Sequence, residues 1–558
     1  MATNGLPEDI PQVFAMIQAA DTVGVFQIES RGQMQTLPKS RPETLDDLVV
    51  EVAIIRPGPI QGNAVHPYLR RKQGLEPVTY LHPSLEPILR DSLGVILYQE
   101  QIMRIAIEVG GFTPAESDGF RRAMGTWRSS REMEKLHQQF FEGCLRQPGM
   151  TAEMAEELFR QVAAFASFGF AKSHAAAFAR TAYESAFLKL FYPAQFLVGL
   201  VNAQPMGFYP VEVLVNDAKR HGVTVLPVDL GRSSYRTTTE WVGRPGEPLP
   251  DGAGVAARPE PIRSPACVIP SAESRDRWIP EVTAGWGVRL GLQLVKGIGK
   301  QHEPLLDGEL ARGPYTSLAD VVERTGLGEE VLERLIRIGA LDGLGQPRRA
   351  LLWQLREVAA SSRGKPAGRG SAAGRGATRA AGRRSAVAGR PMDLRLPATE
   401  APELPPLTES ERIGDAYAVI GLDARRQVVG LFREELDRLG AVTNAALSER
   451  RPGLVRIGGL VVTRQHPMTA KGTVFLALED ETGMVNVTLW PDTWARLRGV
   501  VRRNALLLVD GDLQRDGAVV NVVAREIRPL PEVAGTVAGP DGPDGVRQQG
   551  YAGMRRLG

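Results

Sequence analysis

Apolar residues recur at helical spacing through the first part of the chain. In the segment 99–109 they return every three or four positions, which places them on one face of a helix. The segments 154–166 and 183–202 repeat this spacing, and Gly and Pro clusters separate the periodic stretches. The pattern predicts one mostly helical region over 1–231.

The pattern then changes in character. Residues 232–286 are rich in Pro, Gly and charge, and we interpret them as a mobile insertion around short strand pieces. Helical periodicity returns over 287–357. The following segment, 358–408, contains a run at 359–390 with Arg and Lys but no Asp or Glu and almost no large side chains. Such a run cannot bury enough apolar surface to fold, so a disordered basic linker is predicted.

The last part of the chain switches from helical to strand periodicity. Residues 409–452 predict a helical connector, and 453–530 contain short β-runs separated by turn residues. Strands at this spacing suggest a small barrel, and the tail 531–558 is expected to be disordered. The fold class is therefore multidomain α+β, with helical domains followed by a β-barrel.

Charge and cysteine content exclude only a few classes of protein. The 67 basic and 64 acidic residues give a net charge of +3, which does not by itself indicate a nucleic-acid partner. Cys144 and Cys267 lie far apart and belong to no zinc motif, as expected for a reducing compartment. Neither a signal peptide nor a run long enough to span a membrane is evident, so a soluble cytoplasmic protein is expected.

Five motifs occur in a specific order along the helical region. They are DTVGVFQIESRGQM (21–34), RPGP (56–59), GVILYQEQIMRIA (94–106), FRRAMG (120–125) and FGFAKSHAAAFA (168–179). This ordered series resembles the fingers region of bacterial C-family DNA polymerases, the family of the DNA polymerase III alpha subunit. The resemblance continues through LPVDL, VRLGLQLVKGIG and the β-rich segment, and implies fingers, helix-hairpin-helix and OB-fold domains in that order.

Two segments resemble the error-prone branch of this family. They are NAQPMGFYPVEVLVNDAKRHGV (202–223) and MGTW (124–127), whereas the lysine in FAKSHAA is closer to the replicative form. The resemblance implies template-directed addition of deoxynucleotides to a primer 3′ end, with roles in DNA replication, DNA repair and translesion synthesis.

The AKSHAA motif is a candidate site for the triphosphate of the incoming nucleotide. Ser173 is predicted to cap the helix that follows, and a helix N-terminus flanked by Lys172 and His174 favours phosphate. The alternative is plain capping with a solvated lysine; the family resemblance favours the nucleotide pocket. Arg121 and Arg122 are also nucleotide-binding candidates: one is expected to reach phosphate while the other packs or pairs, the alternative being a surface salt bridge.

Other residues are candidates for contact with the DNA backbone. Arg56, Arg70, Arg71 and Lys72 could bind phosphates, or could form a solvated basic face. The sequence VKGIGK resembles a helix-hairpin-helix turn, in which Gly297 and Gly299 would let backbone N–H groups approach phosphates; a helix C-terminus is the alternative.

The predicted barrel resembles an OB-fold, which binds single strands through aromatic platforms and a basic groove. The candidate platforms are Phe475, Trp490 and Trp494, with core packing as the alternative for Phe475 and Trp490. The candidate charges of the groove are Arg464, Lys471 and Arg496. The segment QVVGLF (427–432) has a weak resemblance to a sliding-clamp-binding peptide, with its leucine displaced. Primer-template DNA, single-stranded template and dNTP are the other expected ligands.

The sequence before Asp21 has no counterpart of the metal-binding carboxylates that nucleotidyl transfer requires. Family members carry paired aspartates in a palm domain upstream of the motif at Asp21, and Asp510-Gly-Asp512 is better explained as a solvated strand end. We therefore expect Mg²⁺ to act in the complete polymerase without binding to this chain alone, and a palm-containing N-terminal half to be a partner. The alternative is a non-catalytic DNA-binding accessory chain of a split polymerase.

Overall fold

The structure is a computed structural model that describes residues 6, 10–55, 65–126, 130–166, 170–243, 285–362, 401–467, 470–516 and 519–530. The chain forms two compact units. The first comprises Met1–Val225, Thr239–Val288 and Arg425–Ala538, and the second comprises Leu226–Thr238, Arg289–Ala424 and Gly539–Gly558. The central part of the predicted insertion, most of the linker and the tail lie outside the described residues.

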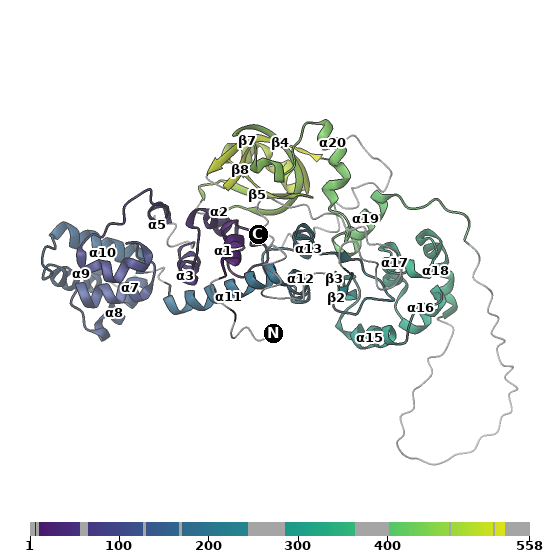
Figure 1. Cartoon of the computed structure of the whole chain (residues 1–558), viewed down its shortest axis with the longest axis horizontal. Helices are drawn as coiled ribbons and strands as arrows, with labels where there is room; N and C mark the ends of the chain where they lie inside the picture. The colour runs from purple at the N-terminus through teal and green to yellow at the C-terminus, as the bar shows by residue number, and fades with distance from the viewer. Residues whose placement is uncertain are drawn as a thin grey trace, which may run out of the picture. The chain divides into compact units, whose positions relative to one another are not determined.

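The N-terminal part of the first unit is helical (Figure 1). Its helices are α1 (Pro11–Gln18), α2 (Arg31–Ser40), α3 (Leu45–Ile54), α5 (Val65–Lys72), α6 (Glu86–Leu89), α7 (Gln99–Arg104), α8 (Pro114–Thr126), α9 (Ser130–Cys144), α10 (Ala152–Ala166), α11 (Lys172–Phe191), α12 (Pro193–Asn202) and α13 (Val211–Arg220). A single turn of π-helix, Ile105–Val109, extends α7.

The long helix α11 packs along α3 in the core of this region. Helix α3 starts at a capping box formed by Thr44 and Asp47, and its residues from Leu48 to Ile54 are all buried. Alanines on α11 are buried at helical spacing, which lets neighbouring backbones approach closely. Tyr183 of α11 accepts a hydrogen bond from the Ile10 N–H at 3.1 Å and so anchors the start of α1.

The C-terminal part of the first unit is a closed five-stranded barrel. Its strands are β4 (Gly453–Gln465), β5 (Val474–Asp480), β6 (Gly483–Leu489), β7 (Leu506–Asp516) and β8 (Val519–Pro529), in the order β4-β5-β6-β8-β7, with α21 (Pro491–Arg503) between β6 and β7. Burial alternates along β6, so that one set of side chains fills the barrel. Only the β6–β8 pair is parallel. This is the predicted OB-fold architecture.

The barrel is docked on the N-terminal helices through buried polar contacts. Arg31, at the start of α2, donates to the backbone oxygen of Leu476 at 2.9 Å and to the hydroxyl of Thr463 at 3.2 Å. Arg220, at the end of α13, pairs with Glu479 of β5 at 2.9 Å. These contacts hold the barrel and the N-terminal helices in one compact unit.

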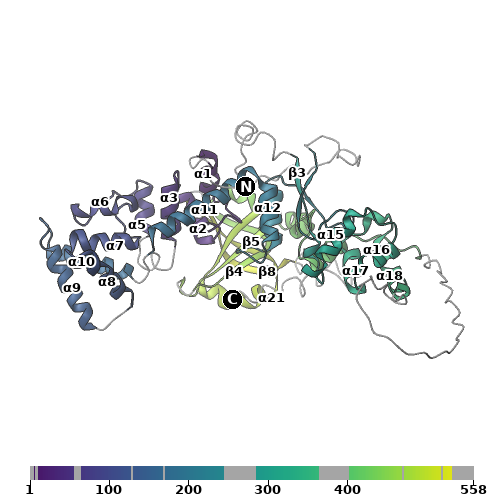
Figure 2. The same ribbon diagram turned by 90° about the horizontal axis from the view of Figure 1, so that it is seen from below.

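The second unit is mainly helical. It contains α15 (Glu303–Ala311), α16 (Leu318–Thr325), α17 (Glu329–Arg337), α18 (Arg348–Ser362) and α19 (Glu409–Ile420). The strands β1 (Val225–Leu226), β2 (Thr238–Trp241) and β3 (Trp286–Arg289) form a sheet in the order β1-β3-β2, and most of their residues belong to the first unit. Figure 2 shows α15 to α18 as one cluster of short helices. The predicted connector contains α19 and, in the first unit, α20 (Arg433–Arg438) with short 3₁₀ turns.

The fold class is thus confirmed as helical domains followed by an OB-type barrel. In the described part of the chain, no helix combines the length and the apolar character that crossing a membrane requires.

Candidate nucleotide and DNA interface

Helix α11 begins at Lys172, so the prediction that Ser173 caps it is wrong. Ala171 is the N-cap residue, and its side chain makes no capping hydrogen bond. The cap comes instead from α7, where both carboxylate oxygens of Glu100 accept the backbone N–H of Lys172, at 2.9 and 3.0 Å. A carboxylate from a distant segment therefore occupies the anion-binding end of this helix, where a phosphate would also be favoured.

The side chain of Lys172 contacts a second carboxylate. Its Nζ lies 2.7 Å from Asp91 Oδ2, and it also lies 5.8 Å from the centre of the Tyr98 ring. The ion pair is partly exposed at both ends, so water and ions reach it. A triphosphate bound here would have to compete with Glu100 and Asp91 for the same positive groups.

His174 lies one position beyond Ser173 on an exposed part of α11. Its ring contacts Phe178 edge-on at 4.0 Å and Phe170 at 5.0 Å. The Phe178 ring in turn stacks on Phe26, at 5.2 Å between ring centres. These phenylalanines were not among the predicted site residues. The signal that could have found them is the spacing of four between Phe170, His174 and Phe178, which places all three on one helix face.

Arg121 and Arg122 both pair with Asp118, as in the surface salt bridge that was the alternative, and the contact of one of them with phosphate stays a prediction. Arg121 lies 2.9 Å and Arg122 2.7 Å from the carboxylate oxygens of Asp118. Spacings of three and four residues bring both guanidinium groups to one carboxylate on α8. Arg121 also donates to Gln99 of α7 at 3.5 Å, next to the residue that caps α11. The pair thus lies beside the candidate nucleotide site.

The basic stretch of α5 is largely paired, and Arg56 lies outside the described residues. Arg71 is mostly buried and donates to the backbone oxygen of Leu93 at 2.7 Å. Both Arg70 and Arg71 contact Glu76 at 3.3 Å, and Lys72 pairs with Asp47. Arg71 therefore has a structural role, while Arg70 has 61% of its side chain exposed and is the more accessible to DNA.

The two glycines of the predicted hairpin differ in backbone conformation. Gly297 has φ of +97°, and a Cβ there would lie 2.8 Å from Val331, so both backbone and space require glycine. Gly299 precedes a short 3₁₀ turn, and its N–H donates to His302 Nδ1 at 3.1 Å. The tight turn is therefore present, but the Gly299 N–H already has an acceptor within the protein.

The aromatic residues of the barrel differ in accessibility. Trp490 is 53% exposed at the start of α21, and Phe475 is half-buried on β5. Trp494 packs against the barrel core, under the Arg502 guanidinium at 5.4 Å. Lys471, in the turn before β5, is exposed. The exposed Trp490 and Lys471 are the accessible candidates, because α2 contacts β5 at Leu476, next to Phe475.

Other candidate charges and motifs in this part of the chain have internal partners. Arg464 donates to the backbone oxygens of Val501 and Asn504, and Arg496 pairs with Glu526. In the segment 427–432, Gln427 is buried and begins a 3₁₀ turn, accepting the Val429 N–H at 2.6 Å. That geometry differs from the exposed, extended peptide that a sliding clamp would need.

The Asp-x-Asp of the barrel is fully paired. Asp510 contacts Arg456 and Arg528, and Asp512 pairs with Arg525. Both aspartates lie inside β7, so the expectation of a solvated strand end is wrong. Their pairing with arginines argues against a metal site.

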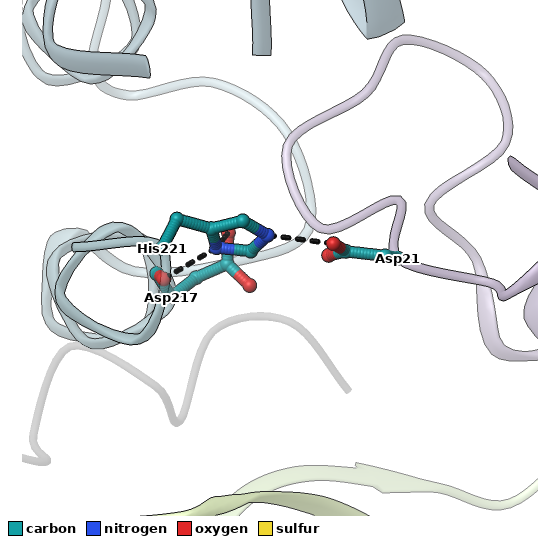
Figure 3. A group of neighbouring side chains, drawn as sticks. All are labelled: Asp21, Asp217 and His221. Atoms are coloured by element: carbon teal, nitrogen blue, oxygen red, sulfur yellow. Dashed lines mark hydrogen bonds and ion pairs between the residues drawn. The ribbon is translucent and has the colours of Figure 1, made fainter. Parts of the chain in front are cut away.

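One group of metal-ligand side chains lies close together among the described residues. Ligand atoms of Asp21, Asp217 and His221 all lie within 4.8 Å of one another (Figure 3). However, the Nζ of the buried Lys189 lies 3.0 Å from Asp21 and 2.9 Å from Asp217. His221 Nε2 lies 2.6 Å from the other oxygen of Asp21. The lysine ammonium already supplies the positive charge, so this group does not fit the Mg²⁺ of a polymerase.

Burial and ion pairing shift the pKa values of this cluster in opposite directions. Burial by itself would raise the pKa of the Asp21 carboxyl, but charges on His221 and Lys189 override it and hold that pKa well below its usual range. Burial would lower the pKa of Lys189, and its two aspartate partners raise it instead. The cluster therefore behaves as a buried ionic network joining the loop at Asp21 to α11 and α13.

These features define a fold class: a helical region combined with a helix-hairpin-helix-type turn and an OB-type barrel. Residues 1–148 match the bacterial DNA polymerase III alpha subunit finger domain. Residues 222–351 match a helix-hairpin-helix motif, and 455–530 match the OB-fold nucleic acid binding domain. The predicted resemblance to the DNA polymerase III alpha subunit family is thus confirmed.

Curated relatives identify the branch. The chain is 40% identical over 521 residues to an error-prone DNA polymerase of Corynebacterium efficiens, covering 93% of this chain and 42% of the relative. It is 38% identical over 526 residues to that of Methylococcus capsulatus, covering 94% and 45%. The error-prone DNA polymerase of Burkholderia pseudomallei is 41% identical over 538 residues, which cover 95% of this chain and 44% of the relative. The chain spans less than half the length of these relatives.

Proposed function

We propose that this chain supplies the nucleotide and DNA contacts of an error-prone DNA-directed DNA polymerase. The reaction would be template-directed nucleotidyl transfer from dNTPs to a primer 3′ end. The observation that carries the proposal is the succession of finger, helix-hairpin-helix and OB-fold domains along one chain that resembles error-prone polymerases. A cytoplasmic location, and roles in DNA repair and translesion synthesis, follow as part of the same proposal.

The dNTP would bind near the N-terminus of α11. Lys172 and His174 are exposed there, and Arg121 and Arg122 on α8 lie beside Gln99 of α7. Positive groups that now pair with carboxylates could pair with phosphate oxygens instead, since both are anionic acceptors. Candidate DNA contacts are Arg70 and Trp490 in the first unit and, separately, the Gly297 turn in the second unit.

The Mg²⁺ ions of the reaction would be held by carboxylates other than those described here. The cluster at Asp21 is neutralised by Lys189, and Asp510 and Asp512 pair with arginines. A palm-containing N-terminal half is the partner that would hold the metals. The arrangement also supports a second candidate function, a non-catalytic DNA-binding accessory chain, because the described carboxylates lack a free metal site. The 3₁₀ turn at 427–432 gives little support to a sliding clamp as a partner.

Two measurements test the proposal. Fluorescence anisotropy with a labelled primer-template should show binding whose log affinity falls linearly with log salt, as phosphate contacts require. Primer extension with Mg²⁺ should be absent for this chain alone and should appear when a palm-containing half is added. Failure to bind DNA at low salt by a folded chain would exclude both candidate functions. Binding without any extension, even after the palm half has been shown to associate, would favour the accessory chain.

A further inference from the structure

A row of aromatic rings lies along α11, beside the candidate nucleotide site. Phe170, His174 and Phe178 are spaced by four residues and so follow one face of the helix, with Phe170 just before its first turn. Adjacent ring centres are 5.0 and 4.0 Å apart, and Phe26 continues the row by stacking on Phe178 at 5.2 Å and 16°. We call these four residues the aromatic row.

The aromatic row is accessible to solvent. His174 is exposed, Phe26 has 38% of its surface exposed, and Phe170 and Phe178 are half-buried. Aromatic side chains that serve only the core are buried on all sides, as Phe120 and Phe140 are elsewhere in the same unit. Phe170 and Phe178 pack partly against the core and meet the His174 ring edge-on, so the row offers partly exposed rings on which other flat rings can stack.

The ring of Phe26 is held in place before any ligand binds. Its backbone N–H donates to the Ser185 hydroxyl on α11 at 3.1 Å. Two residues earlier, the Gly24 N–H donates to the Glu29 carboxylate at 3.1 Å, and a Cβ at Gly24 would lie 2.7 Å from Leu200. The loop is therefore fixed to α11 and packed against α12. A preorganised ring loses little entropy when a ligand stacks on it.

The charges next to the row indicate what would stack there. Lys172 and the N-terminus of α11 lie within one helical turn of His174 and favour phosphate. A ligand that combines flat rings with phosphates is a nucleic acid. Four rings in succession extend beyond the single base of a free nucleotide, so consecutive bases of a strand fit the row better.

We propose that the aromatic row is a stacking platform for the bases of a single-stranded segment of DNA, with Phe178 at its centre. This inference rests on the proposed function, since it assumes that the chain binds DNA. Base stacking on aromatic side chains tolerates any sequence. The row would therefore hold a template strand beside the nucleotide site without reading its bases.

The test compares two oligonucleotides of equal length, one with bases and one built from abasic residues that keep the same phosphates. Phe178→Leu should weaken binding of the base-containing strand about five- to a hundredfold. It should leave binding of the abasic strand unchanged, because leucine keeps the apolar contacts but not the ring. Phe178→Tyr should restore binding. Phe208→Leu is the matched control, since Phe208 is 58% exposed in the same unit but outside the row.

Each outcome has a distinct meaning. Equal weakening of both strands, or no weakening of either, would overturn the stacking platform while leaving the proposed function intact. Weakened binding of dATP with unchanged binding of the strand would assign the row to the incoming nucleotide and overturn its assignment to DNA. No binding of either strand by the folded wild-type chain would overturn the proposed function and this inference together. Circular dichroism checks that each variant is folded.

Discussion

At the scale of single residues, the candidate nucleotide site is an anion site already filled by the protein's own carboxylates. Glu100 caps α11 through the Lys172 N–H, and Asp91 pairs with the Lys172 ammonium. Both groups hold the positions that phosphate oxygens would take. A nucleotide bound here would therefore compete with these carboxylates, and its affinity would depend on residues far from the AKSHAA motif.

We predict that Glu100→Gln strengthens dATP binding and Lys172→Ala weakens it. Removing a negative charge from a helix N-terminus leaves that end more attractive to phosphate by about 0.3–1 kcal/mol, or about two- to fivefold in affinity. Isothermal titration with dATP measures both effects. Glu108→Gln is the control, because Glu108 pairs with Arg104 on the same segment. Unchanged affinity in both test variants would move the triphosphate contact elsewhere.

A second prediction concerns the buried Asp21 and the dependence of stability on pH. Because the folded-state pKa of Asp21 lies below its ordinary value of 3.8, the ionised carboxylate stabilises the folded state above that pH. This stabilisation is lost as the pH falls below 3.8 toward the folded-state pKa. Asp21→Asn should therefore lower the free energy of unfolding at pH 7, and the difference from wild type should shrink as the solution is acidified.

Urea unfolding at several pH values between 7 and 3 measures this difference. Asp512→Asn serves as the control, since its pair with Arg525 is partly exposed and should matter little at any pH. If the free energies of unfolding of wild type and Asp21→Asn differ by the same amount at every pH from 7 to 3, Asp21 acts through packing rather than through its charge.

At the scale of elements, α2 and α13 bind the barrel through buried arginines. Arg31 is buried, and its hydrogen bonds to Leu476 and Thr463 are to neutral acceptors. Burial lowers the pKa of Arg31 to about 10, which still leaves it charged at neutral pH. Arg220, by contrast, pairs with Glu479, whose side chain is fully buried in β5.

We predict that Arg220→Met destabilises the first unit by about 3–5 kcal/mol, because it leaves the Glu479 carboxylate buried without its charged partner. Adding Glu479→Gln should recover part of this loss, since the glutamine is neutral. Arg456→Met, which breaks a partly exposed pair with Asp510, should cost about 0–1 kcal/mol. Chemical denaturation provides all three values. Equal losses for Arg220→Met and Arg456→Met would contradict a buried-charge origin.

At the scale of the whole molecule, the order of domains along the chain differs from their grouping in space. The barrel comes last in the sequence, yet it belongs to the same compact unit as the N-terminal helices. The helices of the second unit lie between them in the sequence. The barrel is therefore held by contacts with α2 and α13 as well as by its covalent connection.

We predict that proteolysis first cuts within 359–390, where the composition is basic and almost without large apolar side chains. The two products should nevertheless elute together in gel filtration, because the barrel remains bound to the N-terminal helices. Introducing Arg220→Met should promote their separation. Separation of the wild-type products under native conditions would show that the interface is too weak to replace the linker.

The sequence by itself determined the elements and the family. Strand periodicity over 453–530 predicted the barrel, and motif order predicted the finger domain, because both depend on local residue patterns. Gly297 could also be identified, since its left-handed backbone selects glycine locally. The exact start of α11 was not predictable in this way, because the capping group is supplied by Glu100, far away along the chain.

Tertiary structure alone decided which groups are free and which are neutralised. Lys189 fills the space between Asp21 and Asp217, although it lies 168 positions from Asp21 and 28 positions from Asp217 along the sequence. Phe26 reaches Phe178 in the same way, because its loop is fixed to α11 through Ser185. Burial and ion pairing depend on distances through space, and a one-dimensional pattern contains those distances only within a helix turn or a strand pair.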